Sequence, residues 1–382
     1  MFRSALIVLA LAGVAAVPSA QACDCGGCPP VSCGTTSSTA DGSGLLFVRP
    51  TGQRGPLRAF DVASGRQRFS LPSGIASADG RRYFAPLAGY AGLRAYDART
   101  GKVLFTSRVI RRGRWFPNGV SANGRNVALE QTEGRVTRFT MFNASRRAVY
   151  RTFSLHGWYD VDAVSNDGRR LFLIQYLNSG GYLIRLFDLD RRVLTARRLT
   201  DKGAPMNGTA WDAVAAPDGH RLMTLYLRGK GVPEVHTLDL VRGTAVCIDL
   251  PSGDPLLVQQ YTLALSANGD TLYAANPGLG VVATVDLSRQ RVVRVDHFPT
   301  RAETAPLAPN AVVSHDGRTL YFTAGQSLYA LDAAYHVVRG AYDAGAPIGG
   351  LAFSPDDRRL VVVRRDGKVV RLNAATGKAV VG

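Results

Sequence analysis

The chain has 382 residues, of which 46% are hydrophobic and 20% are charged, so it has enough apolar material for a globular core. Beyond the first twenty-odd residues no apolar run is long enough to span a membrane. The formal net charge is +17, and 41 of the 46 basic residues are arginine, but they are spread along the chain and not concentrated as in a specific nucleic-acid binder.

Residues 1–22 have the pattern of a secretory signal peptide. Arg3 gives a basic start, residues 5–17 are apolar, and Ala20-Gln21-Ala22 has the small-x-small pattern of a cleavage site. A retained membrane anchor is the alternative, but the apolar segment is short and Pro18 follows it. We therefore expect an exported protein, extracellular or in the cell envelope, with no transmembrane helix after processing.

Residues 23–40 form a Cys-rich segment that contains four of the five cysteines, Cys23, Cys25, Cys28 and Cys33. Four thiolates this close could bind a soft metal, but the spacing lacks the two separated CxxC pairs of a zinc ribbon. An exported chain meets an oxidising compartment, so we predict disulfide bonding for Cys25, Cys28 and Cys33 and no metal. Cys23 could carry a lipid, although Ala-Gln-Ala-Cys is a poor lipoprotein signal.

A repeated unit fills residues 41–382. Turn pairs that tolerate a positive φ angle recur at Asp41-Gly42, Asp79-Gly80, Asn123-Gly124, Asp167-Gly168, Asp218-Gly219, Asn268-Gly269, Asp316-Gly317 and, degenerate, Asp356-Asp357. Each pair is followed by an alternating run that ends in Asp or Asn, at Asp61, Asp97, Asn143, Asp188, Asp239, Asp286, Asp332 and Asn373. The interval from one closing residue to the next is 36 to 51 residues.

The unit predicts four β-strands: one before the turn pair, one after it, one that ends at the closing residue, and a fourth beyond a polar turn. No stretch has a sustained helical period. A four-stranded unit of this length is typical of one blade of a β-propeller, because such a sheet can bury its faces only against neighbouring blades. We therefore predict an all-β protein in which residues 41–382 form the propeller.

Copies such as "LSANGDTLYAANPGLGVVATVD" and "FSPDDRRLVVVRRDGKVVRLN" resemble the YVTN-type repeat of bacterial extracellular β-propellers, a part of the WD40-like superfamily. The resemblance covers roughly residues 40 to 382 and implies fold, not function. The WD40 signature is missing, because no Gly-His precedes the blades and no Trp-Asp closes them, and residues 123–143 lack the Pro and Tyr of the pattern.

The number of blades depends on the first copy. Eight second strands and eight third strands favour eight blades. However, the first copy has only the polar segment "SCGTTSST" where its innermost strand should lie. The alternative is therefore a ring of seven full blades with the first copy as an appended sheet.

Catalytic motifs are absent from the sequence. The six histidines form no metal-binding pair, no nucleophile elbow or phosphate loop occurs, and the mature chain has only four glutamates. A paired glutamate acid and base is therefore not expected. No catalytic residue, metal site or cofactor can be named from this pattern.

Large aromatic residues precede the innermost strand in four consecutive copies. A propeller places these positions around one mouth of its central channel, and polar side chains accompany them. The predicted ligand-binding set is Trp115, Asn118, Trp158, Tyr159, Asp160, Trp211, Asp212, Gln260, Tyr261 and Asn310. The alternative is that these rings only pack between the blades.

Two functions fit the sequence. The first is a monomeric, secreted or surface-attached binding propeller that recognises a small polar ligand or an anionic cell-envelope polymer at one mouth of the channel. The second is a propeller enzyme of the lactonase or quinoprotein type that acts at the same axial site. The sparseness of convergent titratable groups favours the first.

Overall fold

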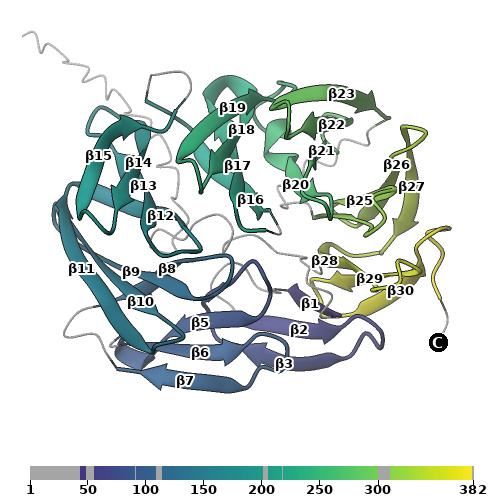
Figure 1. Cartoon of the computed structure of the whole chain (residues 1–382). Coiled ribbons are helices and arrows are strands. Elements are labelled where there is room, and N and C mark those ends of the chain that lie inside the picture. The colour runs from purple at the N-terminus through teal and green to yellow at the C-terminus, as the bar shows by residue number, and fades with distance from the viewer. Residues whose placement is uncertain are drawn as a thin grey trace, which may run out of the picture.

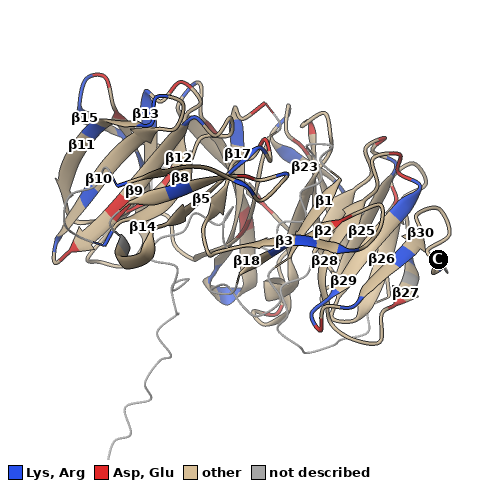
Figure 2. Ribbon diagram, turned by 90° about the horizontal axis from the view of Figure 1, so that it is seen from below, with Lys and Arg blue, Asp and Glu red and all other residues tan. Residues whose placement is uncertain are grey.

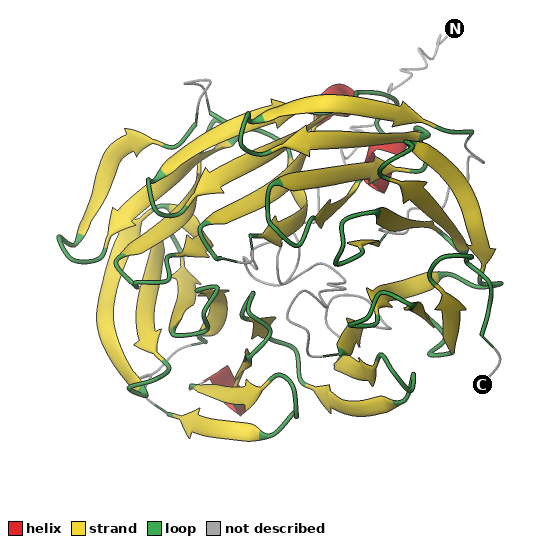
Figure 3. Ribbon diagram, turned by 45° about the vertical axis from the view of Figure 1, so that its right-hand side comes forward, coloured by secondary structure: helices red, strands yellow, loops and turns green. Residues whose placement is uncertain are grey.

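The structure is a computed structural model that describes residues 44–48, 56–90, 92–108, 114–200, 205–216, 218–299 and 310–380. The predicted signal peptide, Cys23, Cys25, Cys28 and Cys33 lie outside these residues. Within the described ranges, antiparallel strands form eight sheets that follow one another around a ring (Figure 1). The few helices there are single 3-10 turns (Figure 3), and none has the length and apolar character needed to cross a membrane.

We number the sheets as blades 1 to 8 in chain order. Blade 1 contains β1 (Leu45–Val48), β2 (Leu57–Asp61) and β3 (Gln67–Leu71), and blade 2 contains β4 (Ile75–Ala76), β5 (Arg82–Pro86), η1 (Ala88–Tyr90), β6 (Leu93–Asp97) and β7 (Val103–Ser107). Blade 3 contains β8 (Phe116–Val120), β9 (Asn126–Glu133), β10 (Val136–Asn143) and β11 (Ala148–His156). Blade 4 contains β12 (Trp158–Val164), β13 (Arg170–Tyr176), β14 (Tyr182–Asp188) and β15 (Val193–Arg198). In blades 2 to 4 the first strand of the blade is at one edge of the sheet and the last is at the other.

Blades 5 to 8 repeat the same arrangement. Blade 5 contains β16 (Thr209–Ala215), β17 (Arg221–Arg228), η2 (Gly229–Gly231), β18 (Val232–Asp239) and β19 (Thr244–Asp249). Blade 6 contains η3 (Leu257–Gln260), β20 (Thr262–Leu265), β21 (Thr271–Asn276), β22 (Val281–Asp286) and β23 (Arg291–His297). Blade 7 contains β24 (Ala311–Val313), β25 (Thr319–Ala324), β26 (Ser327–Asp332) and β27 (Val337–Asp343), and blade 8 contains β28 (Ile348–Phe353), β29 (Arg359–Arg364) and β30 (Val369–Asn373). Every sheet therefore follows chain order, as the repeat predicts.

The core is divided among the blade junctions. One apolar cluster lies between each pair of neighbouring blades, including the junction of blade 8 with blade 1. At that closure Leu46 and Phe60 of blade 1 pack with Val361 of blade 8, and β1 lies beside β28 (Figure 1). The ring has eight blades, so the eight-bladed prediction is confirmed and the seven-bladed alternative is wrong.

Blades 1 and 8 have three strands each among the described residues. The strands of blade 1 correspond to the second, third and fourth strands of the repeat, and the polar segment predicted as its first strand lies outside the described residues. Blade 8 has the first three strands, and an isolated bridge between Leu372 and Ala379 continues the sheet. The other six blades have the four strands that the sequence predicts.

The repeated acidic and amide residues shape the turns on one side of the ring, which we call the turn face. In all eight copies Oδ1 of the closing residue accepts a backbone N–H from two or three residues later, as Asp286 does from Ser288 and Arg289. The Gly of the turn pair has a positive φ in six copies, and Asp357 takes its place at φ 55° in blade 8. The turn chemistry read from the sequence is confirmed.

Charge is mixed around the ring. Figure 2 shows Lys and Arg interspersed with Asp and Glu along the blades seen from the side. Many arginines of the turn face stand near a turn aspartate, such as Arg289 at 3.6 Å from Asp286 and Arg318 at 3.8 Å from Asp316. Such exposed pairs contribute little to stability, so this shell mainly keeps the surface solvated.

Candidate functional site

The predicted aromatic residues lie where the innermost strands begin, on the side of the ring opposite the turn face. Trp158 is the first residue of β12, and Trp115 and Tyr261 directly precede β8 and β20. Trp211 is the third residue of β16. We call this side the entry mouth of the ring.

Burial divides these aromatic residues into two groups. Trp115, Tyr159 and Tyr261 are buried in the apolar clusters between blades 2 and 3, 3 and 4, and 5 and 6, and Trp211 packs part-buried against the last of these clusters. Trp158 is 43% exposed, and its indole N–H donates a hydrogen bond of 2.9 Å to the Gly134 carbonyl in the β9–β10 hairpin of blade 3. Among the predicted rings, Trp158 thus offers the most accessible face.

A pair of carboxyl groups, one of them two residues after Trp158, lies at the junction of blades 3 and 4. Glu130, in β9, is buried and accepts a 2.7 Å hydrogen bond from the Asn118 amide and a 3.2 Å hydrogen bond from the N–H of Val161 in β12. Asp160, in β12, is part-exposed and accepts a 2.6 Å hydrogen bond from the hydroxyl of Tyr176. Neither carboxyl group has an ion pair with Arg or Lys within the described part of the chain.

The two carboxyl groups influence each other. Burial raises the pKa of Glu130 well above its usual value, and the negative charge of Asp160 raises it further. Burial also raises the pKa of Asp160, against the lowering effect of the hydrogen bond from Tyr176. Such a pair holds a shared proton more readily than two separate carboxylates would.

A third acid, Asp162, follows two residues later on β12 at a β-bulge between Val161 and Ala163. It is 2% exposed, and neither of its oxygens has a hydrogen-bond partner. Burial raises its pKa to about 7. The buried hydroxyls of Tyr182 and Tyr226 have pKa values raised by burial and, to a smaller extent, by the charge of Asp162.

The remaining predicted residues stabilise the neighbouring junctions. Asp212 accepts 2.8 Å hydrogen bonds from the N–H groups of Ala213 and Leu263, and the second of these joins blade 5 to the innermost strand of blade 6. Burial raises the pKa of Asp212 to about 6. Gln260 at the end of η3 and Asn310 before β24 are buried, and the N–H of Asn310 donates to Thr323.

The structure therefore joins two of the predicted residues, Asn118 and Asp160, through Glu130, and adds Tyr176. The sequence pattern missed Glu130 and Tyr176. A signal was present, since Glu130 directly follows the three apolar residues 127–129 of its strand and is one of only four glutamates after the leader. The sequence-based expectation concerned only a pair of glutamates, whereas the partner of Glu130 is an aspartate.

The site offers hydrogen-bond acceptors, one exposed indole and a part-exposed phenol. Within the described ranges no group of three or more His, Cys, Asp and Glu side chains could hold a metal ion. Acceptors beside an aromatic face suit a ligand rich in hydroxyl or amine groups.

Comparison with known proteins gives the fold alone. No sequence-family model and no curated protein matches the chain. Among solved structures, it is similar to the dihydro-heme d1 dehydrogenase NirN in complex with DHE, with a TM-score of 0.56 and 16% identity over 90% of this chain and 74% of NirN. It is also similar to the Dos1 propeller, with a TM-score of 0.51 and 12% identity over 82% of this chain and 85% of that one. At such identities the likeness establishes a structurally related eight-bladed β-propeller and no activity.

Proposed function

We propose that the protein is an exported binding propeller that recognises a small polar ligand at the entry mouth of blades 3 and 4. The observation that carries the proposal is the pair of carboxyl groups of Glu130 and Asp160, which has no ion pair with a basic residue of the described chain and lies next to the part-exposed Tyr176. Carboxyl groups that are kept buried at a cost in stability are typical of functional sites, where their chemistry is needed. The likeness of the repeat to the YVTN type, and the leader pattern, support a place outside the cell or in its envelope.

The ligand class follows from charge and shape. The carboxyl pair accepts hydrogen bonds and favours positive charge, and the exposed indole of Trp158 offers a flat apolar face for stacking. A sugar that carries an amino group meets both requirements. We therefore expect glucosamine to bind more tightly than glucose, and glucuronate to bind least.

Tryptophan fluorescence tests the proposal, because Trp158 is more exposed than Trp115 and Trp211. A ligand stacked on Trp158 should protect the emission of the purified protein from quenching by acrylamide. Trp158→Phe should abolish this protection, and Asp160→Asn should weaken binding about tenfold through the loss of a charge-assisted hydrogen bond. Tyr335→Phe, which alters an exposed aromatic residue on blade 7, serves as the control and should bind normally.

Two outcomes would contradict the proposal. One is the absence of protection by any of the three sugars. The other is protection that remains unchanged in Trp158→Phe, because the responding residue would then lie elsewhere.

An enzyme acting at the same mouth is the second candidate, and it is favoured by the two neighbouring carboxyl groups of Glu130 and Asp160, whose pKa values burial raises. A carboxylic acid with a raised pKa can donate its proton to a leaving group. Mass spectrometry of a bound ligand after prolonged incubation separates the two functions. Unchanged ligand supports binding alone, whereas a product that is lost in Glu130→Gln supports catalysis.

A further inference from the structure

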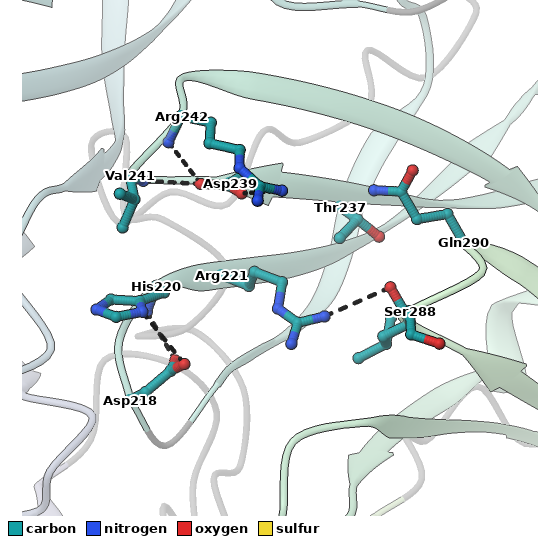
Figure 4. A pocket seen from close by; sticks show the side chains of 10 residues that line it. Asp218, His220, Arg221, Thr237, Asp239, Val241, Arg242, Ser288 and Gln290 are labelled. Carbon is teal, nitrogen blue, oxygen red and sulfur yellow. Dashed lines mark hydrogen bonds and ion pairs between the residues drawn. The ribbon is translucent and has the colours of Figure 1, made fainter.

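A cleft of about 450 Å³ lies between blades 5 and 6 on the turn face, away from the entry mouth. Arg221 at the start of β17 and Thr237 near the end of β18 line it from blade 5, and Ser288 and Gln290 line it from the β22–β23 turn of blade 6. Figure 4 shows the guanidinium of Arg221 extended across this space toward the turn of blade 6. The lining is largely polar.

Arg221 is held more loosely than Arg82 and Arg170, the arginines at the same place in blades 2 and 4. Arg82 donates a 3.0 Å hydrogen bond to the Gly124 carbonyl of the next blade, and Arg170 donates to the carbonyls of Leu240 and Val241. Arg221 reaches the Leu287 carbonyl only at 3.4 Å and Asp270 at 3.9 Å. A guanidinium has five N–H donors, so this one retains several for a ligand.

Thr237 gives a second, independent observation. The residue is 2% exposed, and its hydroxyl is buried with no hydrogen-bond partner although it lines the cleft. A hydroxyl buried without a partner is costly, and valine would fill the same volume without that cost. The hydroxyl of Thr237 is therefore a hydrogen-bond donor on the wall of the cleft that no residue of the described chain uses.

The repeat itself is altered at this junction. In six blades the serine two residues before the turn Asp or Asn donates to that residue, as Ser165 does to Asp167. Its oxygen also accepts the N–H of the first residue of the following strand, as in the bond from Arg170 to Ser165. Blade 5 has Ala216 in this place, so both bonds are missing there.

The acidic residues of the cleft are already engaged in their own turns. Oδ1 of Asp239 accepts the N–H groups of Val241 and Arg242, and Oδ1 of Asp218 accepts the N–H of His220. The second oxygen of Asp218 lies 3.3 Å from the His220 ring, and that of Asp239 lies 4.0 Å from the Arg242 guanidinium. Neither of these two acids forms an ion pair with Arg221, which lies 3.9 Å from Asp270, a residue outside the cleft lining.

We propose that the cleft between blades 5 and 6 binds an oxyanion, a phosphate or carboxylate group carried on a polar molecule. The Arg221 guanidinium donates to the anion, the Thr237 hydroxyl donates a further hydrogen bond, and Arg242 and Gln290 flank it. This site is separate from the entry mouth, and its chemistry suits the repeated anionic groups of a cell-envelope polymer.

Isothermal titration calorimetry with glycerol 3-phosphate and with lactate tests the proposal on the purified protein, with glycerol as the uncharged reference. We expect one site for at least one of the two anions and no heat from glycerol. The tighter anion identifies the oxyanion class. Arg221→Gln should lower the association constant at least tenfold, Arg221→Lys should lower it less, and Thr237→Val should lower it about threefold to tenfold.

Two matched controls distinguish a built site from general attraction to a basic surface. Arg359→Gln removes the same charge from the same strand position in blade 8, and Thr284→Val removes a buried, unpartnered hydroxyl from the same position in blade 6. Both should bind as the unaltered protein does. Equal weakening by Arg359→Gln, no effect of Thr237→Val, or no binding of either anion at millimolar concentration would overturn the proposal. None of these outcomes depends on the sugar experiments at the entry mouth.

Discussion

Asp61 and Asp162 are both strand aspartates, but their surroundings shift their pKa values in opposite directions. Asp61 ends β2 on the turn face, where its Oδ1 accepts the N–H of Ser64 at 2.7 Å and the hydroxyl of Ser64 at 2.8 Å. The hydrogen bond from the Ser64 N–H is the largest cause that lowers the pKa of Asp61. Asp162 is buried in β12 with no hydrogen bond to either oxygen, and burial raises its pKa to about 7.

The same difference separates two groups of acids. On the turn face, hydrogen bonds from Ser288 and Ser314 are the largest causes that lower the pKa of Asp286 and Asp316. Along the innermost strands, burial is the largest cause that raises the pKa of Asp160 and Asp212. Acids of the first group build the fold, whereas ionisation of the second group opposes it at neutral pH.

The largest expected effect is at Asp162. A pKa raised from 3.8 to about 7 means that the folded state binds the proton more tightly than the unfolded state. The stability that protonated Asp162 contributes is therefore fully present below the unfolded pKa and is lost as pH rises through about 7. Ionisation of Asp162 should cost on the order of 4 kcal/mol at pH 8.

Asp162→Asn should remove this pH dependence, so the variant should gain stability relative to the unaltered protein between pH 4.5 and pH 8. Urea unfolding at the two pH values measures the gain. Asp190→Asn, at an exposed turn residue, serves as the control. Parallel stability curves for Asp162→Asn and the unaltered protein would show that the group does not titrate as its burial implies.

A smaller effect is expected at Asp212, an inner acid that also has a structural role. Its Oδ2 accepts the N–H of Leu263 at 2.8 Å, and this bond joins blades 5 and 6. Asp212→Ala leaves that N–H without an acceptor and should cost about 2 kcal/mol at pH 5, where the acid is largely neutral. Asp212→Asn retains an acceptor oxygen and should cost less.

Urea unfolding of the two Asp212 variants at pH 5 tests this role. Equal losses for Asp212→Ala and Asp212→Asn would mean that the hydrogen bond to the next blade contributes no measurable stability there. Asp212 would then differ from the turn-face acids in the same way as Asp162 does, with no structural role of its own.

The fold could be predicted from the sequence because its determinants are local. Each closing residue, such as Asp97 or Asn143, accepts N–H groups from its own turn, so the side chain that recurs along the sequence is also the one that shapes the structure. The alternating runs then fix which residues face the neighbouring blades. Eight closing residues correctly indicated eight blades.

The candidate site could be predicted only in part. The starts of the innermost strands were correctly located, but β8, β12 and β16 each contain a β-bulge, at Asn118, Asp162 and Trp211. A bulge changes which face a residue occupies, and nothing in the alternation of these short strands indicates it. The contact of Glu130 with blade 4 depends on how two sheets pack, which lies beyond any local pattern.

The smallest expected effect is at Asp61 on the turn face. The repeat contains its own test, because Asn143 and Asn373 occupy the same position and accept the same backbone N–H groups. Asp61→Asn should therefore change the stability at pH 7 by less than about 1 kcal/mol. Because the pKa of Asp61 is lowered in the folded state, its charge stabilises the fold above the unfolded pKa, and this contribution is lost as pH falls through the folded pKa. Thermal unfolding at pH 7 and pH 3 should show a slightly smaller acid loss for Asp61→Asn than for the unaltered protein, and a larger acid loss would contradict the contrast between the two groups of acids.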